Sequence, residues 1–311
     1  MVNLMKTRII KKERITKESI FALCVAIIPL VGFILFQLLP IGLVFSTMFV
    51  DMVGFNIDTM QWNNFANFKE VFTDEKFFHS LKVSFILTLP HFFGLVISLA
   101  VSALITQKLK GHKVFKVIFF IPYICSSVAV ATMWKWVFDP NFGIINDVIK
   151  NVLGETHIVK WFSDPKAYTA MLLIVMTWQT PCYGIVMFCA ALTSVNKALY
   201  EAAEIDGASK IRQFFAISLP AISPTTFYLL SAGIIAGLQT FDLAHIFAGD
   251  SWTGSAGPKD AALTTVLYIY NTGINFSRMP QASLMSFILF LIIFTIMLLN
   301  FKLSKKWVSY D

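Results

Sequence analysis

The chain has 311 residues, of which 57% are hydrophobic and only 14% are charged, and its mean hydropathy is +0.70. Soluble domains carry about 25% charged residues, so this composition excludes an ordinary soluble protein and indicates an integral membrane protein surrounded by lipid. The formal net charge is +7, but the basic residues cluster beside apolar runs, where membrane orientation explains them, and we expect no nucleic-acid partner.

Apolar runs long enough to cross a membrane predict an all-α fold, since about 20 such residues span the hydrocarbon core. The six runs cover residues 20–43, 81–105, 116–137, 167–192, 226–247 and 282–301. The first run is longer than the apolar part of a signal peptide and lacks a small-residue cleavage site, so we predict a retained span. Prolines near the middle of several runs predict helices that bend; they are Pro29, Pro90, Pro122 and Pro181.

The basic residues of the connecting segments predict the orientation. An inside N-terminus places most of the 25 Lys and Arg residues on the cytoplasmic side, which by the positive-inside rule favours two cytoplasmic termini. The predicted layout is a basic cytoplasmic N-terminus (1–19), a membrane domain (20–301) that includes a cytoplasmic loop (193–225), and a cytoplasmic tail (302–311). The outer segments are rich in turn residues and predict short helices and turns rather than a domain.

The stretch from Glu201 to Pro220 lies in the predicted cytoplasmic loop and is helix-forming but mildly charged. Gly207 interrupts it and predicts a sharp corner between two short helices, because glycine accepts positive φ angles. Pro220 is expected to end the second helix or begin the next one. Apolar positions recur at helical spacing beside a polar edge. The pattern predicts a projecting element that fits a cleft in another protein.

Sequence patterns for catalysis and metal binding are missing. There is no phosphate-binding P-loop, no H-E-x-x-H pair and no nucleophile elbow, and the five histidines and four cysteines form no cluster. We therefore predict no catalytic residue, no metal site and no cofactor bound by this chain. Energy for any transport would have to enter from a partner through the cytoplasmic loop.

Polar residues inside the predicted spans are few, and a charge there costs about 2.5–3.5 kcal/mol on insertion scales. One hypothesis is a polar substrate path lined by Gln179, Tyr183, Gln239, Asp242 and Ser286. Amides beside aromatic rings suit a sugar, which stacks on rings and needs hydrogen-bond partners. The alternative is that Asp242 lies near enough to the interface to reach water or pair with Lys135. Gly233 and Gly237 form a G-x-x-x-G face, which predicts close helix packing.

The cytoplasmic stretch resembles a known motif. Glu201-Ala-Ala, Gly207-Ala208, Phe214, Ile217, Leu219 and Pro220 match the "EAA" loop of the membrane subunits of binding-protein-dependent ABC importers. Further segments resemble the sugar-transporter branch, specifically its maltose-F-like half; they are Leu35–Pro40, Trp134–Trp136, Phe241-Asp242 and Tyr268–Tyr270. Many members carry Gly-Gly-Pro after the fifth span, whereas this chain has the longer Gly254-Ser-Ala-Gly-Pro258.

The resemblance implies a type I ABC importer permease of six spans in a bacterial cytoplasmic membrane. Its expected partners are a second homologous permease, two ATPase subunits (a homodimer or a heterodimer) that carry ATP and Mg, and an extracytoplasmic solute-binding protein that delivers a sugar. The coupling helix would comprise Glu201, Ala202, Ala203, Gly207 and Ala208. ATP-driven closure of the ATPases would move this helix and switch the spans between inward-open and outward-open states.

Two alternatives stay open. The first is an ABC permease for a non-sugar solute such as a glycerol phosphate ester, for which a Lys or Arg facing the path is expected. The second is an ion-coupled secondary transporter, which needs ionisable residues deep in several spans. A membrane-bound enzyme would need a catalytic cluster, which the sequence lacks.

Overall fold

The computed structural model describes residues 17–52, 54, 56–107, 112–154, 157–249 and 254–309. Residues 1–16 of the predicted basic N-terminus and residues 310–311 of the predicted tail lie outside the described residues. The described chain is mostly helical, with one antiparallel strand pair, β1 (Val50–Asp51) and β2 (Gln61–Trp62), in which Val50 lies opposite Trp62.

The helices confirm the predicted all-α membrane fold. Five helical segments are long and apolar enough to cross a membrane, and they are Cys24–Thr47, Glu75–Thr106, Pro165–Ser194, Ser223–Ala248 and Met279–Ser304. A sixth span is possible if the pair Val114–Ile124 and Ser127–Val137 crosses as one unit, although the two helices meet at 98°. The run 116–137 is therefore not the single helix that its hydropathy suggests, and its break follows Pro122 by a few residues.

Most spans consist of more than one helical element. In chain order they are α1 (Lys17–Phe33), the π-helical η1 (Ile34–Leu38) and α2 (Leu39–Thr47); α4 (Glu75–Thr106); α5 (His112–Ile124) and α6 (Ser127–Val137); α8 (Pro165–Gln179) and α9 (Pro181–Ser194); α13 (Ser223–Leu238) and α14 (Asp242–Ala248); and α16 (Met279–Ser304).

Short elements connect these spans at the two ends of the bundle. At one end lie η2 (Ile57–Thr59), α3 (Ala66–Thr73), α7 (Ile144–Leu153), η4 (Pro258–Asp260), α15 (Thr265–Tyr270) and η5 (Asn271–Asn275), and at the other end lie α10 (Lys197–Ile205), α11 (Lys210–Gln213), η3 (Phe214–Ser218) and α12 (Leu219–Ala221). The short helices predicted for the outer segments are present.

Helix α4 forms the centre of the bundle and contacts α8, α9, α13 and α15. Small residues allow this close approach. A Cβ atom at Gly184 of α9 would lie 2.6 Å from Ser98 Oγ, and one at Gly237 of α13 would lie 2.7 Å from Thr88 Cγ2. The G-x-x-x-G face at 233–237 therefore packs on α4, which confirms the packing role predicted from the sequence.

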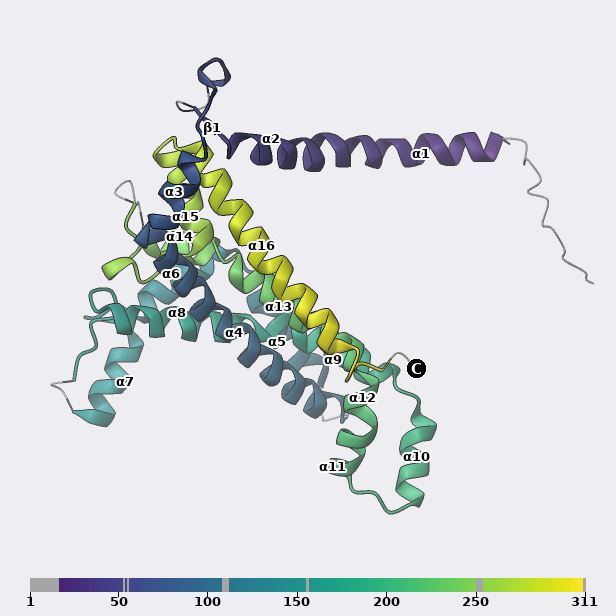
Figure 1. Ribbon diagram of the computed structural model, residues 1–311. Coiled ribbons are helices and arrows are strands. Elements are labelled where there is room, and N and C mark those ends of the chain that lie inside the picture. Colours follow the sequence, from purple (N-terminus) through teal and green to yellow (C-terminus); the bar gives the residue numbers. More distant parts are fainter. Residues whose placement is uncertain are drawn as a thin grey trace, which may run out of the picture.

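The first span projects from the body as an arm (Figure 1), and the most apolar part of it has 0% of its residues buried. It is held near its last turn, where Thr47 Oγ1 donates to Ser283 Oγ of α16 at 2.9 Å. Phe36 on this arm is 78% exposed. An apolar surface of this size requires lipid or another protein to cover it.

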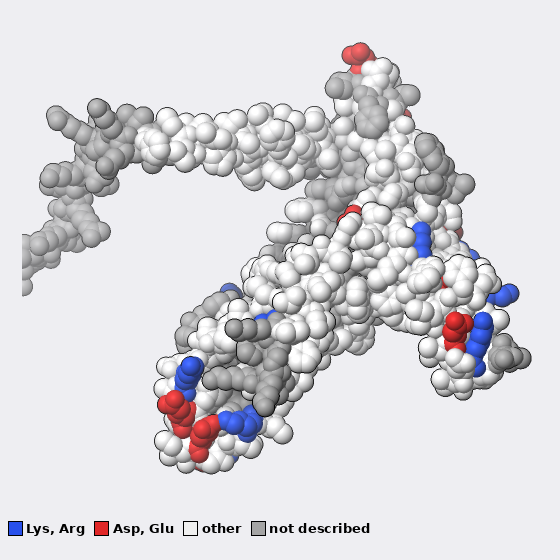
Figure 2. All heavy atoms as spheres, turned by 180° about the vertical axis from the view of Figure 1, so that it is seen from behind, with Lys and Arg blue, Asp and Glu red and all other residues white. Residues whose placement is uncertain are grey.

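Charged side chains gather toward the two ends of the body, and the surface between them is almost free of charge on the face shown in Figure 2. This distribution fits a bundle whose middle lies in hydrocarbon, where charges are costly. The end that carries α10 and α11 also carries the C-terminal residues (Figure 1). Thr106 at the end of α4 and Lys197 at the start of α10 line the same hollow at this end. Helix α4 therefore runs from the opposite end of the bundle toward the end that carries α10.

Candidate functional site: a cavity at the helix breaks and an exposed helical corner

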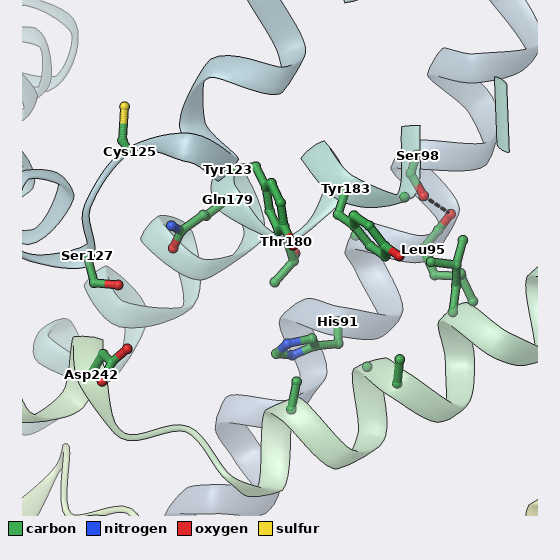
Figure 3. Close-up of a pocket in the computed structure, with 16 residues that line it drawn as sticks. His91, Leu95, Ser98, Tyr123, Cys125, Ser127, Gln179, Thr180, Tyr183 and Asp242 are labelled. Carbon is green, nitrogen blue, oxygen red and sulfur yellow. Dashed lines mark hydrogen bonds between the residues drawn. The ribbon is translucent and has the colours of Figure 1, made fainter. Parts of the chain in front are cut away.

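A cavity of about 500 Å³ lies between α4, α5, α9 and α13 (Figure 3). Its polar lining residues are His91, Ser98, Tyr123, Ser127, Gln179, Thr180, Tyr183 and Asp242. A second cavity of about 400 Å³ adjoins it and shares His91, Ser127, Gln179, Thr180 and Asp242, while adding Gln239 and Thr240. Together the two form a space with polar side chains in its lining, and this space is open to the surface of the described chain, where Tyr123 is 51% exposed and Asp242 is exposed.

Interrupted helices supply this lining. The break between α5 and α6 contributes Cys125 and Ser127, and the irregular segment between α13 and α14 contributes Gln239 and Thr240. Backbone that is not helical is tolerated at membrane depth only where protein buries it or where it borders a water-filled space. The cavity therefore accounts for the helix breaks, because the non-helical backbone borders it.

Stacked rings form one wall of the cavity. The rings of Tyr123 and Tyr183 have centroids 5.3 Å apart and an interplanar angle of 25°, and the hydroxyl of Tyr183 lies 3.3 Å from that of Tyr228. Gln179 projects into the space beside them (Figure 3), and its Nε2 donates to the Pro122 carbonyl at 3.5 Å, which is a long hydrogen bond. The wall thus offers ring faces next to hydroxyl and amide groups, as a sugar requires.

The structure brings together all of the predicted path residues except Ser286. Gln179 and Asp242 line both cavities, Tyr183 lines the first and Gln239 the second. Ser286 lines neither; it lies on α16, where its hydroxyl donates to the Ala282 carbonyl at 2.8 Å. Contact with a substrate stays a prediction for the other four residues. Asp242 begins α14, and Lys135 Nζ donates to the Ile246 carbonyl on that helix at 2.6 Å.

Sequence reasoning missed several cavity residues, and a shared signal could have found them. His91 follows Pro90, Tyr123 follows Pro122, and Thr180 precedes Pro181. A proline inside a span removes a backbone donor and frees a carbonyl, which a nearby polar side chain or water can satisfy. Thr180 makes a different contact, since its Oγ1 donates to the carbonyl of Pro90 itself at 3.0 Å and not to the Ile86 carbonyl that the proline frees. Polar residues beside intramembrane prolines were therefore the informative positions.

The predicted corner between two helices is confirmed. Gly207 has φ +76° and separates α10 from α11. The Ala208 N–H donates to the Ala203 carbonyl at 2.9 Å and the Gly207 N–H to the Glu204 carbonyl at 3.1 Å, which closes the C-terminus of α10 in the manner of a Schellman turn. This closure requires the left-handed backbone at Gly207.

Side chains make the corner rigid. Asn196 Oδ1 accepts from the Ala198 N–H at 3.0 Å and so caps the start of α10. Lys210 forms an ion pair with Glu204 across the turn, and Gln213 Nε2 donates to the Ala208 carbonyl at 3.1 Å. The element therefore has a defined shape without a partner.

The corner is also exposed. Among the described residues α10 has no buried side chain, and Ile205 at the tip is 87% exposed. All of the residues predicted for the coupling helix lie on this element, with Glu201, Ala202 and Gly207 exposed and Ala203 and Ala208 partly exposed. Exposed apolar residues on a rigid projection are typical of a surface that another protein covers. Whether an ATPase binds here stays a prediction.

The part of the chain that the structure describes contains no group of three or more His, Cys, Asp or Glu side chains that could hold a metal ion. The described cysteines are all free thiols, with Cys24 and Cys125 exposed and Cys182 and Cys189 buried.

A multi-span helical bundle with a polar cavity at its helix breaks, and a rigid corner at one end, defines a membrane transport component. The chain belongs to the family of binding-protein-dependent transport system inner membrane components, whose model matches residues 83–308. The matched region includes both the cavity and the corner.

Relatives support this assignment. The "Probable ABC transporter permease protein YesP" of Bacillus subtilis (strain 168) is 32% identical over 308 residues, which cover 97% of this chain and 96% of that protein. The "sn-glycerol-3-phosphate transport system permease protein UgpA" of Yersinia pestis is 30% identical over 283 residues, which cover 89% of this chain and 91% of that protein. The chain is therefore related over nearly its whole length to ABC transporter permeases.

The fold is that of a solved importer. A chain in the crystal structure of a bacterial ABC transporter involved in the import of the acidic polysaccharide alginate superposes with a TM-score of 0.77 at 21% identity, covering 94% of this chain and 98% of that chain. A second structure of a bacterial alginate ABC transporter, in complex with an alginate pentasaccharide-bound periplasmic protein, also superposes with a TM-score of 0.77, at 22% identity. This likeness establishes the type I permease fold predicted from the EAA motif.

Proposed function

We propose that the chain is a permease subunit of an ABC importer that carries a sugar or oligosaccharide across the bacterial cytoplasmic membrane. The observation that carries this proposal is the separation of two sites in one bundle. An exposed corner lies at one end of the spans, and a cavity lined by polar and aromatic side chains lies between α4, α5, α9 and α13. Such a chain receives work from a partner and uses it to move a solute, and it catalyses no reaction itself.

The energy would enter at the corner. Two ATPase subunits, which bind ATP and Mg, would dock on Glu201, Ala202, Ala203, Gly207 and Ala208 and on the corresponding corner of a second permease. Converting a two-state balance from 1:99 to 99:1 takes about 5.5 kcal/mol, which ATP binding and hydrolysis can supply. The projecting first span supports the partner permease, because its apolar faces are free to pack on a second membrane subunit.

The corner between α10 and α11 also predicts the orientation of the chain in the membrane. If the corner meets cytoplasmic ATPases, then the C-terminal residues at the same end of the bundle are cytoplasmic (Figure 1). The six-span arrangement then places the N-terminus on the cytoplasmic side too, in agreement with the positive-inside rule. The end with α3, α7 and α15 would face the extracytoplasmic solute-binding protein that delivers the substrate.

The cavity favours a neutral saccharide over a glycerol phosphate ester. Among the described residues that line the two cavities, Asp242 is acidic and none is Lys or Arg. A phosphate dianion needs cationic or strongly donating partners, whereas a sugar needs ring faces and uncharged hydrogen-bonding groups. The stacked pair Tyr123 and Tyr183 beside Gln179 supplies the latter.

The test is transport by the assembled complex in proteoliposomes, with its partner permease, ATPases and binding protein. We expect uptake of labelled oligosaccharide that requires ATP inside the vesicles and that an excess of glycerol 3-phosphate does not inhibit. Inhibition by glycerol 3-phosphate but not by oligosaccharides would overturn the choice of substrate. Uptake by the purified chain alone, driven by an ion gradient, would overturn the importer proposal.

A further inference from the structure

We propose that a groove between α4 and α8, distinct from the transport cavity, binds an anionic phospholipid of the outer leaflet. The groove has a volume of about 480 Å³ and lies at the end of the bundle away from α10. Three lysines from three different segments line it, namely Lys82, Lys166 and Lys259. Ile86, Ala170 and Leu173 form its apolar wall. We call it the lysine-rimmed groove.

The order of these groups along the helices matches the order of groups in a lipid. Lys82 lies in the first turns of α4 and Lys166 in the first turn of α8. At a rise of 1.5 Å per residue, Ile86 lies about 6 Å farther along α4 than Lys82, and Leu173 about 10 Å farther along α8 than Lys166. The cations thus lie at the depth of the headgroups, and the apolar wall continues toward the acyl chains, given the proposed orientation.

The lysines are available to an anion. All three side chains are exposed, and the ion pairs found among the described residues involve other cations. The two neighbouring carboxylates each accept a backbone hydrogen bond and form no ion pair with these lysines in the described part of the chain, since Asp164 Oδ1 accepts from the Lys166 N–H at 3.1 Å and Asp260 Oδ1 from the Ala256 N–H at 3.0 Å. An ammonium group without a fixed partner suits a phosphate.

The loop that carries the third lysine has an unusual backbone. Lys259 and Asp260 have φ angles of +50° and +59°, a left-handed conformation that costs free energy for residues other than glycine. A contact joins this loop to α4, since His79 Nε2 lies 3.2 Å from the Asp260 carbonyl oxygen. His79 also lines the groove. The loop thus places Lys259 in the lining of the groove, together with Lys82 and Lys166.

A lipid fits this groove better than an acidic soluble protein does. Leu89 and Phe93 follow Lys82 and Ile86 at helical spacing on the same side of α4, and they are 45% and 59% exposed. This stripe continues the apolar wall into the depth of the hydrocarbon region. A soluble protein would reach the lysines but would leave the wall and the stripe uncovered, whereas an acyl chain covers both.

Native mass spectrometry of the purified full-length chain tests the proposal, with equimolar phosphatidylglycerol and phosphatidylcholine in the detergent solution. Each lysine near an anionic surface contributes a factor of about five in affinity, so three contribute on the order of a hundredfold. We expect the wild-type chain to retain phosphatidylglycerol in preference. The variant K82A/K166A/K259A should lose most of that preference.

The matched control is K69A/K76A/K160A, which removes three exposed lysines from the same end of the bundle but outside the groove. It should retain the wild-type preference. The variant Ala170→Leu, which fills the apolar wall and keeps every lysine, should reduce retention of phosphatidylglycerol but not of free inorganic phosphate. Equal losses in both lysine variants, or no loss in K82A/K166A/K259A, would overturn the proposal, as would full retention by Ala170→Leu.

Discussion

Replacing Gly207 by valine tests whether the shape of the corner matters for transport. In the described structure no atom lies within 4 Å of a Cβ added at Gly207, so the side chain meets no steric barrier. The cost is conformational, because φ is +76° there and a β-branched residue in the left-handed region loses about 1–3 kcal/mol. A local loss of about 2 kcal/mol lowers the population of the closed corner relative to open forms by roughly 30-fold.

The assay is ATP-driven uptake by the assembled complex, measured together with copurification of the ATPase subunits. We expect Gly207→Val to reduce both, while the amount of chain in the membrane stays at the wild-type level, since the corner has no buried core of its own. Gly207→Asn is the control, because asparagine tolerates the left-handed region far better than valine does. Wild-type uptake by Gly207→Val, or an equal loss in both variants, would refute the reasoning.

Three further changes probe the corner, the cavity and the end of the bundle that carries α15. Glu201→Lys reverses a charge on the exposed face of α10 and should abolish ATPase copurification; unchanged copurification would contradict a docking role. Tyr183→Leu removes the ring stacked on Tyr123 and should raise the half-saturating sugar concentration roughly three- to tenfold, whereas a change in maximal rate alone would argue against sugar contact. Burial and the hydrogen bond to Asp74 raise the pKa of the Tyr268 hydroxyl in the folded chain above its ordinary 10.0. The neutral hydroxyl therefore favours the folded state below pH 10, and this contribution to the free energy of unfolding is lost as the pH rises further. Tyr268→Phe should cost about 1 kcal/mol at pH 7 and should flatten that alkaline fall in melting temperature; an unchanged pH profile would contradict the assignment.

The spans and the corner could be predicted because each depends on local sequence. A run of about 20 apolar residues is enough to locate a span, and a glycine after a short helical stretch is enough to locate its end. The 98° bend between α5 and α6 could not be predicted. Pro122 indicates an interruption, but the angle depends on how each half packs on neighbouring helices.

The cavity was only partly predictable, because hydropathy does not fix the rotation of a helix about its axis. Gln179 and Asp242 lie at helix breaks, where irregular backbone and polar side chains favour the same water-filled space. Ser286 lies within the unbroken α16, where its hydroxyl can bond to the carbonyl one turn earlier in any environment. A serine in a continuous span therefore carries much less information than a polar residue at an interruption.

Helix α13 connects the corner to the cavity. It begins at Ser223, soon after η3, and the start of this path is tied to the corner because the Tyr200 hydroxyl of α10 lies 2.8 Å from Ser218 Oγ. Further along, Gly233 and Ala236 of the same helix line the first cavity. Gly233 also approaches His91 of α4 so closely that an added Cβ would lie 3.2 Å from His91 Cβ. Because this contact leaves little room between the two helices, we expect a displacement of the corner to move the cavity wall on α13 together with His91 of α4.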